Sequence, residues 1–202
     1  FAIVGSGPAG MYAAEALLKN VPDCHIDVFE KYPAPYGLIR YGVAPDHYKT
    51  RNTSRQFART FEEAAVSYYG NVEIGKDISI DELKEHYDAV ILAMGAYNDR
   101  TLGIEGENLD GVYGACAFVG WYNGHPDYRD LDPMLDTESV AVIGVGNVAL
   151  DICRVMAKTR TEHGASDICA HALEAIESSP LNKLHMFGRR GAVEAGFTPK
   201  EL

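Results

Sequence analysis

The sequence predicts an α/β protein with two Rossmann-like, three-layer dinucleotide-binding domains. Two observations predict this fold. Short apolar runs alternate with helical stretches along the chain, which is typical of parallel α/β structure. A glycine-rich turn between a strand and a helix also occurs twice, near residues 1–30 and 140–190. We expect the first domain to span residues 1–98 and the second to span residues 99–202.

Hydrophobic periodicity and turn residues place the elements of the first domain. The expected strands cover residues 1–5, 26–30, 72–74 and 89–94. The expected helices cover residues 8–19, about 51–68, and a short stretch that opens near Ser79, with Ser79 or Asp81 as its N-cap. The continuous apolar run over 89–94 is typical of a strand buried on both faces.

In the second domain, a connector over 96–112 precedes the same kind of alternation. The expected strands cover residues 140–144 and 184–187. The expected helices cover residues 114–123, a stretch from Asn147, and residues 167–178, with a loop over 125–138. The second glycine turn lies about twice as far from the end of its next strand as is usual, so we expect an inserted segment over about 159–180.

Composition and charge exclude several classes of function. With a formal net charge of −11, the chain is a poor candidate for general nucleic-acid binding. No run approaches eighteen consecutive apolar residues, so we expect no stable membrane insertion. No two of the four cysteines are spaced CxxC or CxxxxC, which argues against a zinc site and a redox-active dithiol; we expect no metal site and buried free thiols.

The first glycine turn is a GxGxxG motif over residues 5–10 that follows a strand and opens a helix. In the dinucleotide fingerprint, Gly5 permits the tight turn, Gly7 admits a pyrophosphate, and Gly10 allows close packing of helix on strand. The helix N-terminus stabilises the phosphate charge. Glu30, at the end of the next strand, can accept hydrogen bonds from a ribose diol.

The second glycine turn is a GxGxxA motif that begins with Gly144 and Gly146. The next strand ends before Arg189 and Arg190, where an acid would be expected for NAD. Guanidinium groups bind a 2′-phosphate, so this site is predicted to select NADP(H); the alternative is a solvated arginine pair. A diol-preferring site and a 2′-phosphate site together imply FAD and NADPH, and hydride transfer between them.

Several segments give the chain a wider resemblance. They include PYGLIRYGVAPDH over residues 35–47, FVGWYN over 118–123, GNVALD over 146–151, GRRG over 188–191, and FT with EL at the end of the chain. With these segments the whole chain resembles the adrenodoxin reductase type of ferredoxin–NADP reductase, a branch of the glutathione-reductase-like flavoproteins.

The resemblance implies roles for single residues. FAD contacts are implied for Ala9, Glu30, Leu38 and Ile74, and pyrophosphate contacts with NADP for Val145, Gly146, Asn147 and Val148. Arg189 and Arg190 would bind the 2′-phosphate, and Glu201 would place a carboxylate by the NADP site. His47 and Asp151 fall where the family has polar groups near the flavin and nicotinamide, as candidate catalytic residues. The alternatives are a structural loop histidine and a helix-surface acid.

The resemblance also implies electron transfer from NADPH through FAD to a ferredoxin-type iron–sulfur protein. Two alternatives remain open at this point: an enzyme like the small subunit of glutamate synthase, and a non-catalytic NADP(H)-binding regulator. The expected compartment is a bacterial cytoplasm, or the mitochondrial matrix if a transit peptide is missing.

The family implies an FAD domain that is discontinuous and incomplete here. Both ends look cut, so we expect an N-terminal fragment that alone holds FAD weakly. A ferredoxin docking face would need local positive charge, and residues 40–59 offer five basic residues against Asp46 alone. The competing interpretation of that segment is a solvated helix face or contacts to another part of the protein.

Overall fold

The computed structural model describes residues 1–96 and 98–198, and of Ala192 only the backbone. The chain separates into two compact units. The first comprises Phe1–Val43 and Tyr48–Tyr97, and the second comprises Ala44–His47 and Asn98–Leu202. Both are mixed α/β structures built on parallel strands, which confirms the predicted fold class.

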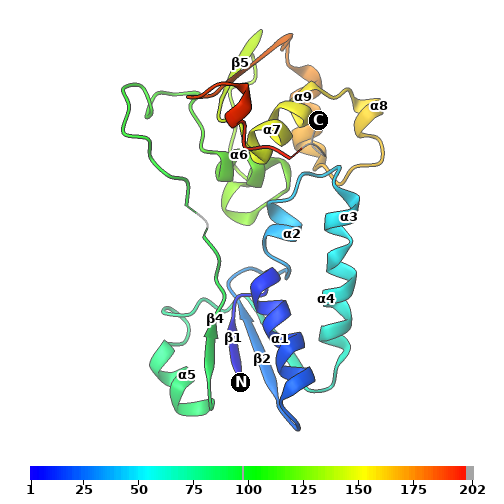
Figure 1. The fold of residues 1–202 in the computed structure, drawn as a ribbon, viewed down its shortest axis with the longest axis vertical. Coiled ribbons are helices and arrows are strands. Elements are labelled where there is room, and N and C mark those ends of the chain that lie inside the picture. Colours follow the sequence, from blue (N-terminus) through cyan, green and yellow to red (C-terminus); the bar gives the residue numbers. More distant parts are fainter. Residues whose placement is uncertain (97, 199–202) are drawn as a thin grey trace. The chain divides into compact units, whose positions relative to one another are not determined.

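The first unit is built on a four-stranded parallel sheet with the order β3-β2-β1-β4. Its strands are β1 (Ala2–Val4), β2 (Ile26–Glu30), β3 (Val66–Gly70) and β4 (Val90–Leu92). Its helices are α1 (Pro8–Asn20), α2 (Leu38–Tyr41), α3 (Tyr48–Arg51), α4 (Thr53–Glu62) and α5 (Ile80–His86). Figure 1 shows α1 lying against β1 and β2.

Side chains of β1 alternate between the two faces of this sheet, as the period of a strand requires. Ile3 packs on one side with Ala14 of α1 and with residues of β2. Ala2 and Val4 pack on the other side with Leu83 of α5. Helices therefore cover both faces, which is the three-layer arrangement that the sequence predicted.

Three expectations for this unit are wrong. The helix expected over 51–68 ends at Glu62, and the strand expected near 72–74 lies instead at Val66–Gly70. Its β-branched and aromatic side chains pair in register with β2, and this sheet pairing overrides the helical pattern. The strand expected to be buried on both faces is β4, which forms the edge of the sheet and leaves Leu92 53% exposed.

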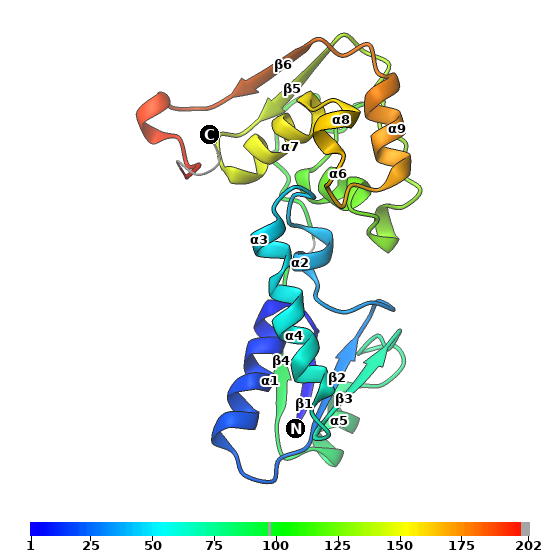
Figure 2. The same ribbon diagram turned by 90° about the vertical axis from the view of Figure 1, so that its right-hand side faces the viewer.

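The second unit contains a two-stranded parallel sheet of β5 (Ser139–Ile143) and β6 (Lys183–Phe187). Its α-helices are α6 (Ala115–Tyr122), α7 (Asn147–Ala157), α8 (Arg160–His163) and α9 (Ala170–Ser178), and its 3₁₀ helices are η1 (Pro126–Tyr128) and η2 (Ala192–Glu194). Figure 2 shows β5 and β6 side by side, with α7 beside them. The inserted segment predicted between α7 and β6 forms α8 and α9.

One core joins the elements of the second unit. Aromatic side chains of α6, including Trp121 and Tyr122, pack against apolar side chains of α7, α9 and β5. The buried side chains of α7 in this core include Ile152 and Val155, and the opposite face of α7 carries polar side chains. This packing fixes α7, and with it the polar residues described below.

The cysteines are free thiols, as expected, but none is fully buried and Cys116 is exposed, so the expectation of burial is wrong. Within residues 1–96 and 98–198, every helix is too short or too polar to cross a lipid bilayer.

Candidate nucleotide-binding sites

The first glycine turn lies between β1 and α1, and two of its glycines are required by packing. Gly5 has a φ of +105°, and its N–H donates to Phe29 O at 2.7 Å. A Cβ built on Gly5 would lie 2.4 Å from Ala93 O, and one built on Gly10 would lie 1.9 Å from Gly5 O. A larger residue at Gly5 would press on the carbonyl that follows β4, and one at Gly10 would push α1 away from the turn, so the fingerprint requires glycine at both positions.

Gly7 plays a different part, because it leaves space over the helix N-terminus. The nearest atom to a Cβ built there is 3.9 Å away, at Gly37. Gly7 is the N-cap of α1, which has no side-chain cap and no acidic residue in its first turn. The first N–H groups of α1 thus keep their capacity to bind an anion.

Two other helices of the described residues have N-termini whose backbone N–H groups are capped by side chains. In α5, Ser79 and Glu82 form a capping box, and in α8, Thr159 and Glu162 form another. Each satisfies backbone donors and places an acid in the first turn. The helices that follow the two glycine turns lack both features, as do α4, α6 and α9.

Glu30 supports the first glycine turn from the end of β2. The residue is 4% exposed, and Oε2 of its carboxylate accepts hydrogen bonds from Ser6 N at 3.0 Å and Ser6 Oγ at 2.6 Å. Oε1 accepts from Tyr32 N at 3.2 Å. A carboxylate has about four acceptor positions, so these three bonds are compatible with a further bond from a ribose hydroxyl. The sequence pattern did not point to Ser6.

The other residues proposed for the first site lie in different settings. Ala9 is exposed in the first turn of α1. Leu38 is half-exposed at the start of α2 and lies over Gly42. Ile74 is partly buried against Val4 and Leu83 of the core, and its backbone forms an isolated bridge with Ile78.

The second glycine turn repeats the geometry of the first. Gly144 has a φ of +145°, and its N–H donates to Phe187 O, the last residue of β6, at 2.8 Å. Gly146 is the N-cap of α7, again with no side-chain cap and no acid in the first turn. A Cβ built on Gly146 would meet nothing within 4 Å. The open space and the uncapped helix fit a pyrophosphate.

The two sites differ at the residue that follows the carbonyl bonded by the first glycine of each turn, which is Phe29 O in the first unit and Phe187 O in the second. In the first unit it is Glu30, and in the second it is Gly188, which is followed by Arg189 and Arg190. A Cβ on Gly188 would lie 2.9 Å from a methyl group of Val145, so this turn passes close to the glycine loop. Both arginines are exposed.

The segment after η2 crosses the second glycine turn. Gly196 N donates to Val145 O, and Thr198 N donates to Asn147 Oδ1, each at 2.8 Å. Val148 remains half-exposed in the first turn of α7. Glu201 lies outside the described residues.

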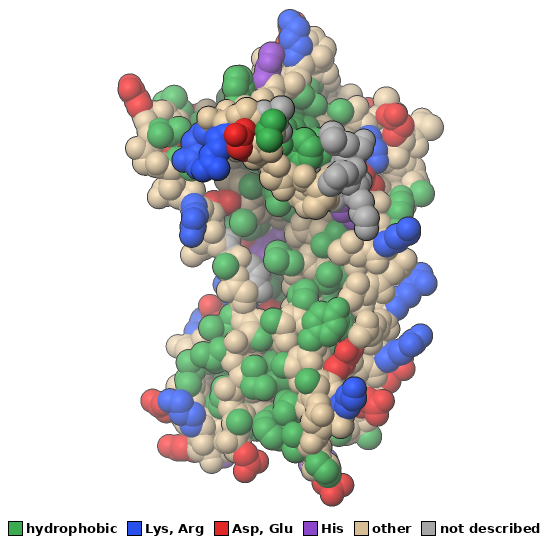
Figure 3. Space-filling view, viewed as in Figure 1, with side chains coloured by type: hydrophobic (Ala, Val, Ile, Leu, Met, Phe, Trp, Pro, Cys, Tyr) green, Lys and Arg blue, Asp and Glu red, His purple; other side chains and the backbone are tan. Residues whose placement is uncertain are grey.

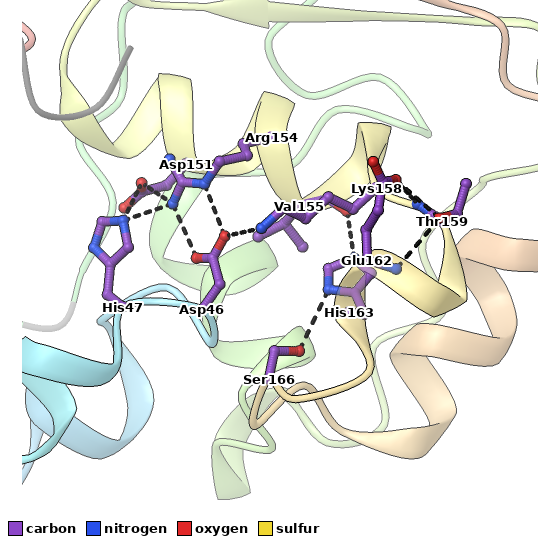
Figure 4. Close-up of polar contacts among 10 residues, drawn as sticks. All are labelled: Asp46, His47, Asp151, Arg154, Val155, Lys158, Thr159, Glu162, His163 and Ser166. Atoms are coloured by element: carbon purple, nitrogen blue, oxygen red, sulfur yellow. Dashed lines mark hydrogen bonds and ion pairs between the residues drawn. The ribbon is translucent and has the colours of Figure 1, made fainter.

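The two candidate catalytic residues meet in one polar cluster on α7 (Figure 4). Arg154 donates to both carboxylate oxygens of Asp46, at 2.9 and 3.0 Å, and to Asp151 Oδ1 at 2.7 Å. His47 Nε2 lies 2.7 Å from Arg154 Nη2 and 3.5 Å from Asp151 Oδ1. Lys158 adds a second cation on Asp46.

Burial and charge act in opposite directions on this cluster. The Asp46 carboxylate is 9% exposed. Burial alone would raise its pKa, but hydrogen bonds and charge from Arg154 and Lys158 outweigh that effect and hold the pKa of Asp46 well below its usual range. The hydrogen bond to Asp46 likewise raises the pKa of Arg154, together with Asp151 and against desolvation.

Arg154 is the shared partner in this cluster. Its Nη2 lies within hydrogen-bond distance of Asp46 Oδ1, Asp151 Oδ1 and His47 Nε2. The sequence named His47 and Asp151 but not Arg154 or Lys158. The i, i+3 spacing of Asp151 and Arg154 on one helix was the available signal.

Among residues 1–96 and 98–198, no group of three or more His, Cys, Asp or Glu side chains is placed to hold a metal ion.

Comparison with known proteins places these sites in a family. The family described as pyridine nucleotide-disulphide oxidoreductase matches residues 1–179. The chain is 48% identical over 201 residues to mitochondrial NADPH:adrenodoxin oxidoreductase of Arabidopsis thaliana, covering 99% of the chain and 42% of that protein. It is 44% identical over 206 residues to NADPH-ferredoxin reductase FprA of Mycobacterium tuberculosis, covering 45% of that protein.

The structure agrees with the sequence comparison. FprA of Mycobacterium tuberculosis in complex with NADPH superposes with a TM-score of 0.95 at 44% identity, over 99% of this chain and 45% of that one. The chain thus spans about two fifths of the length of the relatives that it matches. The resemblance to the adrenodoxin reductase type is confirmed, and the chain belongs to the pyridine nucleotide-disulphide oxidoreductase family.

Proposed function

We propose that this chain is part of a flavoprotein that passes electrons from NADPH through FAD to a ferredoxin-type iron–sulfur protein. One observation carries the proposal. Two glycine turns have the same hydrogen bond to the end of the next strand, but one is followed by Glu30 and the other by Gly188, Arg189 and Arg190. The acid in the first turn's site fits a ribose diol, and the arginines in the second turn's site fit a 2′-phosphate.

The first turn would hold the pyrophosphate of FAD over Gly7, with Glu30 at the ribose. The second would hold the pyrophosphate of NADP(H) over Gly146, with Arg189 and Arg190 at the 2′-phosphate. In domain terms, residues 1–98 would form the first half of the FAD-binding domain and residues 99–202 part of the NADP(H)-binding domain. When bound, the two cofactors supply the redox chemistry: hydride transfer from nicotinamide to flavin, then single-electron release.

The protein contributes placement and charge. Open backbone donors at the two helix N-termini would orient the cofactors without a side chain moving. Arg154 lies within hydrogen-bond distance of His47 Nε2 and holds Asp151 by a direct ion pair. We therefore propose that His47 and Asp151 lie near the flavin and the nicotinamide, and that Arg154 is the residue that positions them.

The relatives that support this proposal carry mitochondrial and bacterial names. We propose that this chain works in a bacterial cytoplasm, with the mitochondrial matrix as the alternative compartment.

The proposal is tested by anaerobic visible absorption of the full-length gene product, titrated with NADPH and separately with NADH. We expect a yellow flavin spectrum that NADPH bleaches at far lower concentration than NADH does. Reduction of an added ferredoxin-type iron–sulfur protein should then follow. A colourless protein, or a flavin that NADPH leaves oxidised, would contradict the reductase and favour a non-catalytic NADP(H)-binding regulator.

A further inference from the structure

Tyr36 has a backbone conformation that bulky residues rarely adopt. Its φ is +87°, in the left-handed region that favours glycine. Among the described residues, the other non-glycine residues with positive φ are Asp23 and Asn71, at +53° and +59°. The short side chains of Asp and Asn tolerate this region, whereas an aromatic residue there is strained and persists only where its surroundings hold it in place.

Tyr36 lies in a turn that is bonded to the first glycine turn. Its N–H donates to Ser6 O at 3.1 Å, and its carbonyl accepts from Ile39 N at 3.0 Å. The next residue, Gly37, is buried and has a φ of +47° and a ψ of −121°, a combination that favours glycine. Its Cα is the nearest atom to a Cβ built on Gly7, at 3.9 Å. The backbone after Tyr36 therefore forms one wall of the space over Gly7.

The ring of Tyr36 holds this backbone in place. It packs against Phe57 and Phe61 of α4, with the ring centroids 6.1 Å away in each case. The guanidinium carbon of Arg40 lies 5.6 Å from the centroid of the Tyr36 ring, and Arg40 Nε donates to Pro35 O at 3.0 Å. Since relaxation of φ to a negative value would pull the ring out of these contacts, the packing of the ring opposes that relaxation.

The same turn sets the position of the residue that follows it. Leu38 begins α2 and is 54% exposed. Tyr12 of α1 is 50% exposed, and Figure 3 shows hydrophobic side chains at the surface over this helix. Because Gly37 is the N-cap of α2, a change of φ at Tyr36 would move the exposed side chain of Leu38 together with the wall over the glycine turn.

We propose that Tyr36 is a positioning residue for the flavin nucleotide, an inference that rests on the proposed function. Its ring is the anchor, and its left-handed backbone keeps Gly37 at the edge of the space over Gly7 in which the pyrophosphate would lie. Because packing of the ring offsets the backbone strain in the cofactor-free protein, this wall of the site is in place before the ligand binds.

The test replaces Tyr36 in the full-length flavoprotein, removes the flavin, and measures the Kd for added FAD. Tyr36→Phe keeps the ring, so its Kd should stay within about twofold of the parent value. Tyr36→Ala removes the ring that holds φ positive, and its Kd should rise about tenfold or more. Tyr36→Gly also removes the ring but adopts positive φ without strain, so its Kd should rise only about threefold. Lost packing alone predicts the reverse order, because glycine is smaller than alanine and is more flexible.

Tyr69 of β3 is the matched control, because it is 43% exposed and has the extended backbone of a strand. Thermal unfolding of the cofactor-free proteins should give opposite orders at the two positions. Tyr69→Gly should unfold at a lower temperature than Tyr69→Ala, whereas Tyr36→Gly should unfold at a higher temperature than Tyr36→Ala. Neither change at Tyr69 should alter the Kd for FAD by more than about twofold.

A Kd for FAD in Tyr36→Gly equal to or above that in Tyr36→Ala would overturn the positioning role while leaving the proposed function intact. A Kd for Tyr36→Phe as high as that for Tyr36→Ala would also overturn it, since the hydroxyl group would then be the part that acts. A parent protein that binds no FAD would overturn both proposals.

Should Tyr36→Ala fail to fold, Tyr36→Asn replaces it in the comparison. Asparagine tolerates positive φ, as it does at Asn71, so the Kd for FAD in this variant should lie within about threefold of that in Tyr36→Gly. A Kd about tenfold above that of Tyr36→Gly would refute the proposal, because a side chain compatible with the left-handed backbone would then have failed to preserve the site.

Discussion

Ser6 and Glu30 are joined by two hydrogen bonds to a single carboxylate oxygen, from the backbone nitrogen at 3.0 Å and from the hydroxyl at 2.6 Å. Both residues are buried. The acid that the fingerprint assigns to a ribose thus also holds the glycine turn in shape before any ligand binds. Preorganisation of this kind lowers the ordering cost of binding.

Glu30→Ala should therefore destabilise the cofactor-free protein as well as weaken flavin binding. The change leaves the buried N–H groups of Ser6 and Tyr32 without their acceptor, at about 1–3 kcal/mol each when no water replaces it. Urea unfolding of the apoprotein measures the loss. Glu85→Ala on the exposed face of α5 is the control, and an equal, small effect of both changes would refute the supporting role.

Gly10 and Gly146 should respond differently to alanine. Gly10→Ala places a Cβ 1.9 Å from Gly5 O, so helix and strand must separate, and we expect a loss of about 3 kcal/mol or more in unfolding free energy. Gly146→Ala meets no protein atom, so the protein should fold normally while its NADPH affinity falls at least tenfold. Thermal unfolding and an NADPH titration separate the two effects. Normal NADPH affinity in Gly146→Ala would show that the space over Gly146 is not used.

Arg189→Ala with Arg190→Ala should remove the preference for NADPH over NADH. Hydrogen bonds to charged groups contribute about 1.5–3 kcal/mol, so the pair should raise the Kd for NADPH by one to two orders of magnitude. The Kd for NADH should change less than twofold, because NADH has no 2′-phosphate. Arg129→Ala, at an exposed arginine of the same unit, is the control. Equal weakening of both nucleotides would count against the assignment.

Asp46 should make stability depend on pH in the acid range. Its pKa is lower in the folded protein than in the unfolded chain, where it is about 4. Its contribution is therefore fully present above about pH 4 and declines as the pH falls toward the folded value. Asp46→Asn should reduce the unfolding free energy at pH 7 by about 3 kcal/mol, and the gap to the parent protein should narrow below pH 4.

Urea unfolding at several pH values checks this dependence, with Asp130→Asn at a fully exposed aspartate as the control. A gap that stays constant between pH 7 and pH 3 would show that the Asp46 charge does not stabilise the fold.

Most of the fold could be predicted because its signals are local. The glycine turns, the N-cap at Ser79, one of two positions considered, and the strand over 26–30 each depend on residues close together in sequence, and each was found. The prediction at β3 was wrong because the interaction that decides its structure is not local in sequence. Its residues follow a helix without a strong stop signal, and only pairing with β2 makes them a strand.

By itself, the sequence determined the two glycine turns, the acid after one strand and the arginines after the other, because each motif is read along one strand–turn–helix segment. Tertiary structure alone decided the contact of Ser6 with Glu30 and the cluster on Asp46, in which Arg154 lies 108 residues away. Such ion pairs form only where folding brings distant segments into a partly dehydrated space. There charges attract strongly enough to hold them, and no local pattern in the sequence records that proximity.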